Sequence, residues 1–193
     1  PAILEDALID KVLAGERITP EDARALYLLP LVELGELANR RRDLAKRAAY
    51  DGRGTEIVTY IIDRNINYTN VCNVYCKFCA FYRRPGDTRE GYLLPKAVIF
   101  KKIEETLAIG GTGVLMQGGH HPYLKTAWWC ELLSDLRARF PLVNLHALSA
   151  PELDHLAKLD KRPVEGVIAD LKSAGLGSVP GAGAEVLVER VRK

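Results

Sequence analysis

The sequence predicts an α/β protein in which N-terminal helices precede a series of parallel β/α units. Apolar residues recur at helical spacing through the first 50 residues. From residue 56 onward, short segments of strand character alternate with segments of helical character. Such alternation is typical of a (β/α) barrel or an open doubly wound sheet. We therefore expect a helical segment over residues 1–55 and a β/α region over residues 56–193.

The N-terminal segment contains the start signal of one helix and the apolar spacing of another. Thr19 stands at an N-cap position, Pro20 at the first helical position and Asp22 in the first turn. The leucines of the second helix recur at near-helical spacing, at Leu31, Leu34, Leu37 and Leu44. Both patterns predict helices between residues 19 and 50.

The second region has the order expected of about four β/α units, whereas a complete barrel of eight needs about 250 residues. The predicted strands are residues 56–65, 113–119, 142–150 and 176–180. The predicted helices are residues 94–111, 124–140, 151–175 (as one helix or two) and 184–193. The first strand is rich in β-branched residues, so we expect it to be buried. The region is thus long enough for a partial barrel.

Three stretches fall at the C-terminal ends of predicted strands. They are the cysteine-rich stretch at 69–84, "QGGHH" at 117–121 and "ALSAPE" at 147–152. Function in parallel β/α folds sits at this end of the strands. The sequence therefore predicts one site built from three loops.

Composition excludes several classes of protein. Lys and Arg total 27 against 25 Asp and Glu, a net charge of +2, and a dedicated nucleic-acid binder is usually much more basic. No apolar run approaches the roughly 20 residues of a membrane span. The first residues are acidic, unlike a signal peptide. Three of the four cysteines are clustered, which favours reduced thiols in the cytoplasm over disulfides.

The clustered cysteines are Cys72, Cys76 and Cys79, in a Cys-x3-Cys-x2-Cys spacing. A structural zinc site usually has four ligands, so His120 or His121 would have to complete it. Cys76 and Cys79 alone have the spacing of a redox dithiol. Closely spaced thiolates also hold iron–sulfur clusters. With three cysteines, a four-iron cluster keeps one iron open for another ligand.

The cysteine motif, with Phe78 before its last cysteine and a predicted strand before its first, resembles the signature of the radical S-adenosylmethionine (SAM) superfamily. The resemblance implies a partial radical SAM (β/α) barrel with a 4Fe-4S cluster. It also implies that the open iron binds SAM, whose cleavage yields a 5′-deoxyadenosyl radical. "QGG" stands where the superfamily has a Gly-Gly-Glu-like motif, so Gln117 or backbone carbonyls would replace the missing acid.

Longer stretches resemble a narrower family. They are "VTYIIDRNINYTNVC", "CKFCAFYR", "QGGHHP", "LHALSAPE" and "AGLGSVPGAGAEVLVERVR". Together they are similar to cyclic dehypoxanthinyl futalosine synthases of menaquinone biosynthesis, which convert dehypoxanthinyl futalosine to its cyclic form. Members of that family continue well past residue 193, so the resemblance implies an N-terminal portion, truncated before the barrel closes. "CAFYR" is shared with aminofutalosine synthases and deazaflavin-cofactor synthases, which remain the alternative activities.

The resemblance implies roles for several residues. Cys72, Cys76 and Cys79 would bind the cluster. Candidates for SAM contact are Phe78, Gln117, Gly118, Gly119, Ser149 and Glu152. An arginine suits a benzoate substrate, and Arg64, Arg83 and Arg84 are candidates. The implied reaction takes place at the benzoate ring of the substrate, which must lose a proton to become aromatic again. Candidates for accepting this proton are His146, His120 and His121.

The implied partners are a small-molecule substrate and a low-potential electron donor of the flavodoxin or ferredoxin type, with no nucleic acid and no membrane. If the half-barrel is real, two copies are expected to pair. A third alternative to both enzyme classes is an inactive or zinc-binding fragment. Among the other residues, His155 is expected at the surface, Trp129 at a helix–sheet interface, and Tyr68 packed near the cluster or stacked on substrate.

Overall fold

The computed structural model describes residues 6–47, 49–181 and 188–192. The chain divides into two compact units, Pro1–Tyr60 and Ile61–Lys193. The predicted division after residue 55 stays a prediction.

The first unit is helical. It contains α1 (Asp6–Ala14), α2 (Pro20–Tyr27) and α3 (Leu31–Arg47). The predicted start of α2 is confirmed: the Asp22 amide donates to Thr19 Oγ1 at 3.2 Å, and the Thr19 amide donates to the Asp22 carboxylate at 2.8 Å. This reciprocal pair satisfies two of the donors that a helix start leaves unpaired. The Lys11 ammonium, 2.6 Å from the same carboxylate, links α1 to α2.

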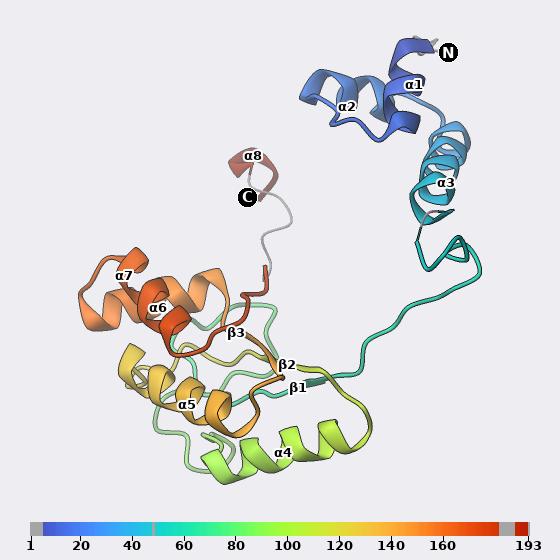
Figure 1. Ribbon diagram of the computed structural model, residues 1–193. Coiled ribbons are helices and arrows are strands. Elements are labelled where there is room, and N and C mark those ends of the chain that lie inside the picture. The colour runs from blue at the N-terminus through green and yellow to red at the C-terminus, as the bar shows by residue number, and fades with distance from the viewer. Residues whose placement is uncertain (1–5, 48, 182–187, 193) are drawn as a thin grey trace. The chain divides into compact units, whose positions relative to one another are not determined.

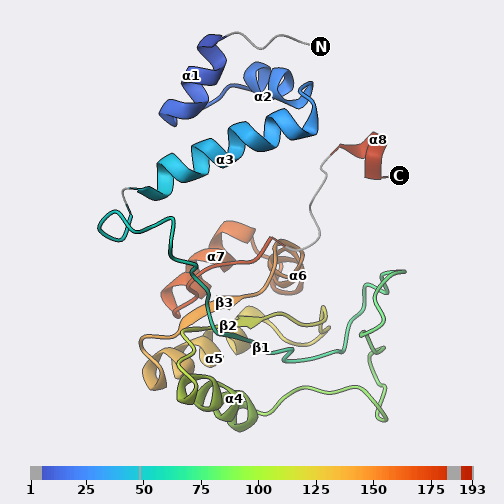
Figure 2. The same ribbon diagram turned by 90° about the vertical axis from the view of Figure 1, so that its right-hand side faces the viewer.

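The second unit is built on a three-stranded parallel sheet in the order β1-β2-β3 (Figures 1 and 2). Its strands are β1 (Asp63–Asn65), β2 (Gly113–Met116) and β3 (Asn144–Ala147). Its helices are α4 (Lys96–Ala108), α5 (Thr126–Arg139), α6 (Ala150–Asp160), α7 (Val164–Ser173) and α8 (Glu189–Arg192). The predicted α/β class is thereby confirmed.

The sheet has one covered face and one more open face. Arg64, Val114 and Leu145 are in register across the three strands, and Val114 and Leu145 are fully buried on the side of α4 and α5. The next row, Asn65 and Leu115 with its β3 neighbour, is exposed or half-buried. Because side chains alternate along a strand, the two rows point to opposite faces. The open face is the one on which a barrel would have its interior.

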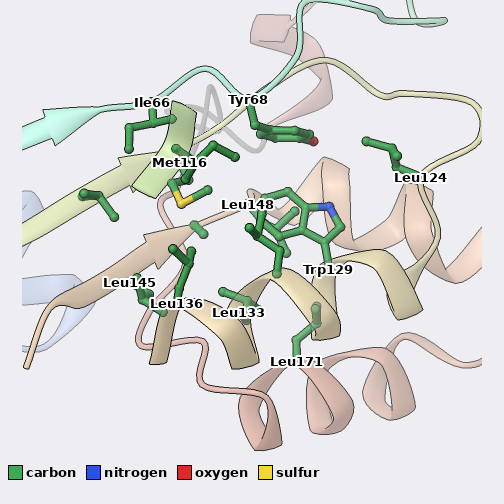
Figure 3. Packing of buried hydrophobic residues seen from close by; sticks show 14 of the residues in the cluster. Ile66, Tyr68, Met116, Leu124, Trp129, Leu133, Leu136, Leu145, Leu148 and Leu171 are labelled. Carbon is green, nitrogen blue, oxygen red and sulfur yellow. The ribbon is translucent and has the colours of Figure 1, made fainter. Parts of the chain in front are cut away.

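The core lies between the covered face and the helices (Figure 3). Trp129, Leu133 and Leu136 of α5 are buried beneath the sheet, and Leu171 brings α7 into the same cluster. The ring of Tyr68 packs edge-on against Trp129, with centroids 4.6 Å apart. The predicted position of Trp129 at the helix–sheet interface is confirmed.

Two strand predictions were wrong in extent. Of the predicted strand 56–65, only β1 pairs with a neighbour, and Val58, Tyr60 and Ile61 are at least three-quarters exposed. β-branched residues favour strands only where another strand and a packed face accept them, and β2 begins opposite Asp63. Within the described residues, the predicted strand 176–180 is a single bridge from Ser178 to β3. The sheet therefore has three strands plus the start of a fourth, rather than four strands.

The predicted helices agree with the structure, and residues 151–175 form the two helices α6 and α7. The last predicted helix, residues 184–193, falls partly outside the described residues, because residues 184–187 and 193 are not described; α8 lies within its second half.

Candidate functional site

The three cysteines lie on a loop that is closed at its base by backbone hydrogen bonds. After β1, the Cys72 amide donates to the Arg83 carbonyl at 2.9 Å, and the Arg83 amide donates to the Asn70 carbonyl at 2.8 Å. A turn inside the loop brings the Cys79 amide to the Cys76 carbonyl at 3.1 Å. Residues 72–83 therefore form a closed loop, which we call the cysteine loop.

The donor chemistry of the cysteine loop fits an iron–sulfur cluster with one open iron. All three thiols are free; Cys72 and Cys79 are half-buried and Cys76 is exposed. Among the described residues, no group of three or more His, Cys, Asp or Glu side chains is gathered around a common point. To bind a cluster, the three thiols would therefore have to turn toward one another. Phe78 is 91% exposed, so its ring is accessible to a ligand.

Gly118 and Gly119 allow the cysteine loop to approach the end of β2. A Cβ atom on Gly118 would lie 2.6 Å from the Tyr68 ring, and one on Gly119 would lie 2.8 Å from Cys72 Cβ. Two backbone hydrogen bonds complete the contact, from the Gly119 amide to the Thr69 carbonyl at 3.0 Å and from Asn73 to the His120 carbonyl at 3.2 Å. Side chains at these two positions would push the loops apart.

The carboxylate of Glu152 joins the ends of all three strands. Its Oε1 accepts hydrogen bonds from the Tyr68 hydroxyl at 3.1 Å and the Gly118 amide at 3.2 Å. Its Oε2 accepts from the Ser149 hydroxyl at 2.6 Å. Tyr68 follows β1, Gly118 follows β2 and Ser149 follows β3. The carboxylate therefore acts as a connection between the three loops of the predicted site.

Burial decides the electrostatics of this network. The Glu152 side chain is buried, which raises the pKa of its carboxyl although its hydrogen bonds oppose the shift. Burial, together with the neighbouring Glu152 charge, raises the pKa of Tyr68 well above its ordinary value. Tyr68 therefore keeps its proton and serves as a hydrogen-bond donor.

Ser149 and Glu152 use their polar atoms within the protein. Ser149 is the N-cap of α6, and its hydroxyl accepts from the Glu152 amide at 3.4 Å while donating to the same residue's carboxylate. Leu148, directly before it, is fully buried with φ at +64°, a strained conformation for a branched residue. Gln117, the remaining predicted SAM contact, is half-buried at the end of β2.

His146 lies on the open face of the sheet. It belongs to the same row as Leu115, and its Nδ1 is hydrogen-bonded to Ser178 Oγ at 2.6 Å. The side chain is half-exposed. Of the predicted proton acceptors, His146 is the one that belongs to a strand and lies on the open face of the sheet.

The other three histidines gather beside Tyr68 and Glu152. The rings of His120 and His155 are stacked 4.8 Å apart, and His155 Nε2 is 3.1 Å from the His121 carbonyl. Burial lowers the pKa of both His120 and His121, and His155 lowers each further. The expectation that His155 is only a surface residue was wrong, because it is half-buried in this group.

The histidine group encloses a small cavity. Its volume is about 10 Å³, and its polar lining includes Tyr68, Glu152 and the three histidines. A cavity of roughly this size suits a single water molecule when several polar groups surround it.

The three candidate arginines have different environments. Arg64 points to the covered face, where its guanidinium is 2.6 Å from Glu105 and 3.4 Å from the Lys102 carbonyl on α4. Arg83 is bonded within the cysteine loop. Arg84 is exposed, and its guanidinium lies 5.4 Å from the centre of the Tyr75 ring. The structure thus separates Arg64 from His146 by the thickness of the sheet.

Comparison with known proteins identifies the superfamily. A family model described as the radical SAM superfamily matches residues 66–181, which is more than half of the chain. The chain belongs to the radical SAM superfamily. The match begins at the end of β1 and includes the cysteine loop, Gly118, Gly119 and Glu152. Proteins of this superfamily are enzymes that generally use a 4Fe-4S cluster and SAM, and the thiols of the cysteine loop are suitable ligands for such a cluster.

Two relatives indicate the narrower relationship. The chain is 46% identical over 188 residues to "Cyclic dehypoxanthine futalosine synthase" of Streptomyces coelicolor, covering 96% of this chain and 46% of that protein. It is 36% identical to "5-amino-6-(D-ribitylamino)uracil--L-tyrosine 4-hydroxyphenyl transferase" of Trichormus variabilis, covering 97% of this chain and 48% of that protein. The chain spans about half the length of the curated relatives it matches.

A solved structure resembles this chain as well. HydG, a maturase of the FeFe-hydrogenase, matches with a TM-score of 0.57 at 14% identity, covering 90% of this chain and 45% of HydG. At that identity the likeness shows the fold alone. In the part of the chain that the structure describes, no helix is long and apolar enough to cross a membrane.

Gly119→Ala tests the close approach of the cysteine loop. The added methyl group has no space beside Cys72, so we expect a loss of about 1–3 kcal/mol in the free energy of unfolding. Urea unfolding measures this loss. Gly181→Ala is the control, because among the described residues nothing lies within 4 Å of an added Cβ there. An unchanged unfolding midpoint in Gly119→Ala would show that the loop does not pack as described.

Glu152→Gln tests the buried carboxyl through pH. The raised pKa means that the folded protein holds this proton more tightly than the unfolded chain, whose ordinary value is 4.5. Linkage then requires the free energy of unfolding to fall as pH rises from 4.5 through the folded-state pKa. The amide of Gln does not titrate, so the free energy of unfolding should fall less with rising pH in Glu152→Gln. Urea unfolding over a pH series measures it.

The control for this experiment is Glu165→Gln, at an exposed position on α7. It should keep the pH dependence of the wild type. If Glu152→Gln also keeps it, Glu152 is not titrating from a buried state.

Proposed function

We propose that this chain carries the cluster- and SAM-binding part of a cyclase that converts dehypoxanthinyl futalosine to cyclic dehypoxanthinyl futalosine in menaquinone biosynthesis. The observation that carries the proposal is the 46% identity to a relative of that name, over 96% of this chain. The geometry of the loops supports it, because the three cysteines and the SAM candidates all follow strands of one sheet.

Within this proposal, Cys72, Cys76 and Cys79 hold a 4Fe-4S cluster with one iron left for SAM. When bound, the cluster and SAM supply the 5′-deoxyadenosyl radical that removes a hydrogen atom from the sugar of the substrate. Phe78 offers an exposed ring beside the cluster for packing against the adenine. Gln117 and the backbone at Gly118 and Gly119 offer polar groups for the SAM amine.

Glu152 and Ser149 support this site from behind. Their side chains already bond to each other, to Tyr68 and to Gly118. We therefore assign them to holding the three loops in place, so that the SAM candidates in front of them keep their position. A fixed arrangement of reacting groups contributes strongly to catalysis.

The sugar radical would add to the benzoate ring of the substrate, and restoring aromaticity then requires loss of a proton and an electron. The electron would return to the cluster, which gave one up to cleave SAM. His146 faces the side of the sheet where the barrel interior would be, and we assign it as the proton acceptor. When its Nδ1 carries the hydrogen and donates to Ser178 Oγ, its Nε2 lone pair is available for the proton. His120 is the second candidate, and its lowered pKa favours the neutral form that a base requires.

A benzoate substrate needs a cation on the same side as the cluster. Arg64 is paired with Glu105 on the covered face, and Arg83 is bonded within the loop. Arg84 is exposed and directly follows the cysteine loop, so we assign the carboxylate-binding role to Arg84 in place of Arg64. The free thiols are compatible with a cytoplasmic setting, and we propose a flavodoxin- or ferredoxin-type donor for the electron that the cluster would need. Pairing of two copies stays a prediction.

A second candidate is the reaction of the 36% identical transferase, whose match extends over 193 residues. Both candidates need the same cluster, so only their substrates separate them. The remaining alternative is an inactive or zinc-binding fragment, in which the cysteines take one metal ion.

Anaerobic reconstitution of the chain with iron and sulfide tests the proposal. We expect about four irons per chain and, after reduction, an electron paramagnetic resonance signal that changes when SAM is added, because SAM binds the open iron. Cys76→Ala should lose the signal, whereas Cys130→Ala, outside the loop, should keep it. Retention of zinc with no iron cluster would reject both enzyme candidates.

Dehypoxanthinyl futalosine, dithionite and SAM are then added to the loaded chain. The cyclase predicts 5′-deoxyadenosine and the cyclised product, measured by mass spectrometry. If products form only with 5-amino-6-(D-ribitylamino)uracil and tyrosine, the transferase is the correct assignment.

A further inference from the structure

The guanidinium of Arg83 is hydrogen-bonded to the backbone of the cysteine loop and to Glu90, so it is not available to bind a substrate. Its Nη1 donates to the Tyr82 carbonyl at 2.9 Å and, at longer range, to the carbonyls of Ala80 at 3.3 Å and Phe81 at 3.5 Å. Its Nε and Nη2 both lie 2.5 Å from the Glu90 carboxylate. Each of the three guanidinium nitrogens therefore has a partner within the protein.

The three carbonyls follow Cys79 directly in the chain. A short loop with no regular structure leaves such carbonyls to water, and its backbone then exchanges among several conformations. A guanidinium presents its donors in a rigid plane, so it can satisfy several carbonyls at once and fix their directions. Arg83 thus restricts the backbone between the last cysteine and the closure of the loop.

Glu90, the partner of Arg83, is itself anchored. Its amide donates to Asp87 Oδ1 at 3.0 Å, and its carbonyl accepts from Asn70 Nδ2 at 2.9 Å. The Asn70 side chain also accepts from the Tyr92 amide at 2.9 Å. Because Asn70 lies at the base of the cysteine loop, these bonds connect Arg83 back to the segment that leaves β1. The guanidinium therefore connects both ends of the loop with a second, folded segment.

We propose that Arg83, held by Glu90, is a positioning residue for the iron–sulfur cluster. It fixes the backbone on which Cys79 sits, so that the thiols need only rotate to meet the irons. It acts through the loop and does not bind the carboxylate of the substrate. This inference rests on the proposed function, because it concerns the cluster that the three cysteines would hold.

The first test uses the chain without iron. Arg83→Gln removes the guanidinium, and we expect Cys79 to be alkylated by iodoacetamide on the order of tenfold faster, the ratio that follows from losing one charge-assisted hydrogen bond. Peptide mass spectrometry measures each cysteine separately, with Cys130 on α5 as the internal reference. The control is Arg89→Gln, which changes an exposed side chain next to Glu90 in the sequence. It should leave the alkylation rates of all four cysteines as in the wild type.

Two further variants separate a positioning role from general stabilisation. Arg83→Lys keeps the charge but lacks the planar fork, so it should not restore the slow rate at Cys79. Glu90→Gln keeps the shape of the partner, and it should shift the rate in the same direction by a smaller factor. Circular dichroism checks that each variant keeps its helices, and Glu90→Gln carries the test if Arg83→Gln does not fold.

Reconstitution with iron and sulfide provides the second readout. We expect Arg83→Gln to retain several-fold less iron than the wild type and to lose its cluster signal faster in air. If Arg83→Gln loads iron normally and Cys79 reacts at the wild-type rate, the inference is overturned. If the wild type itself takes no cluster, the proposed function fails instead, and the iron-free alkylation rates still decide whether Arg83 orders the loop.

Discussion

The site depends on one buried carboxylate. Glu152 accepts hydrogen bonds from groups that follow each of the three strands, namely Tyr68, Gly118 and Ser149. Ionised, it is an acceptor for all three donors, and burial alone would disfavour that charge. Backbone hydrogen bonds such as Gly119 to Thr69 also join the first two loops, but Glu152 is the side chain that reaches all three, beyond a sheet whose strands have three or four residues each. The carboxylate therefore converts three separate strand ends into one platform.

The cysteine loop depends on that platform for its position. Glu152 holds the Gly118 amide, Gly118 leaves room for the Tyr68 ring, and Gly119 admits the start of the loop at Cys72 at a distance that any side chain would prevent. The far side of the loop is ordered by Arg83 and Glu90. Glu152 and the two glycines thus set the position of the cysteine loop, whereas Arg83 and Glu90 set the conformation of its backbone. Both are needed if flexible thiols are to meet a cluster without a large entropic cost.

Local signals in the sequence predicted the parts of the structure that local interactions determine. Thr19, Pro20 and Asp22 predicted the start of α2, because a helix cap is decided within four residues. The strand at 56–65 was predicted too long, since its β-branched residues do not reveal whether a neighbouring strand is present. The contact between Tyr68 and Glu152 joins residues 84 positions apart, and neither residue type alone indicates it. Arg64 faces α4 because the register of β1 places it beside Val114 on the covered face, and the residue types alone do not reveal that register.

A crystal structure of the iron-loaded chain, phased by anomalous scattering at the iron edge, tests the central claim most directly. We predict a four-iron cluster bonded to the sulfur atoms of Cys72, Cys76 and Cys79, with the fourth iron free of protein ligands. Glu152 should still accept its hydrogen bond from the Gly118 amide behind the loop. A fourth ligand from His120 or His121, or a single metal ion in place of the cluster, would contradict the claim.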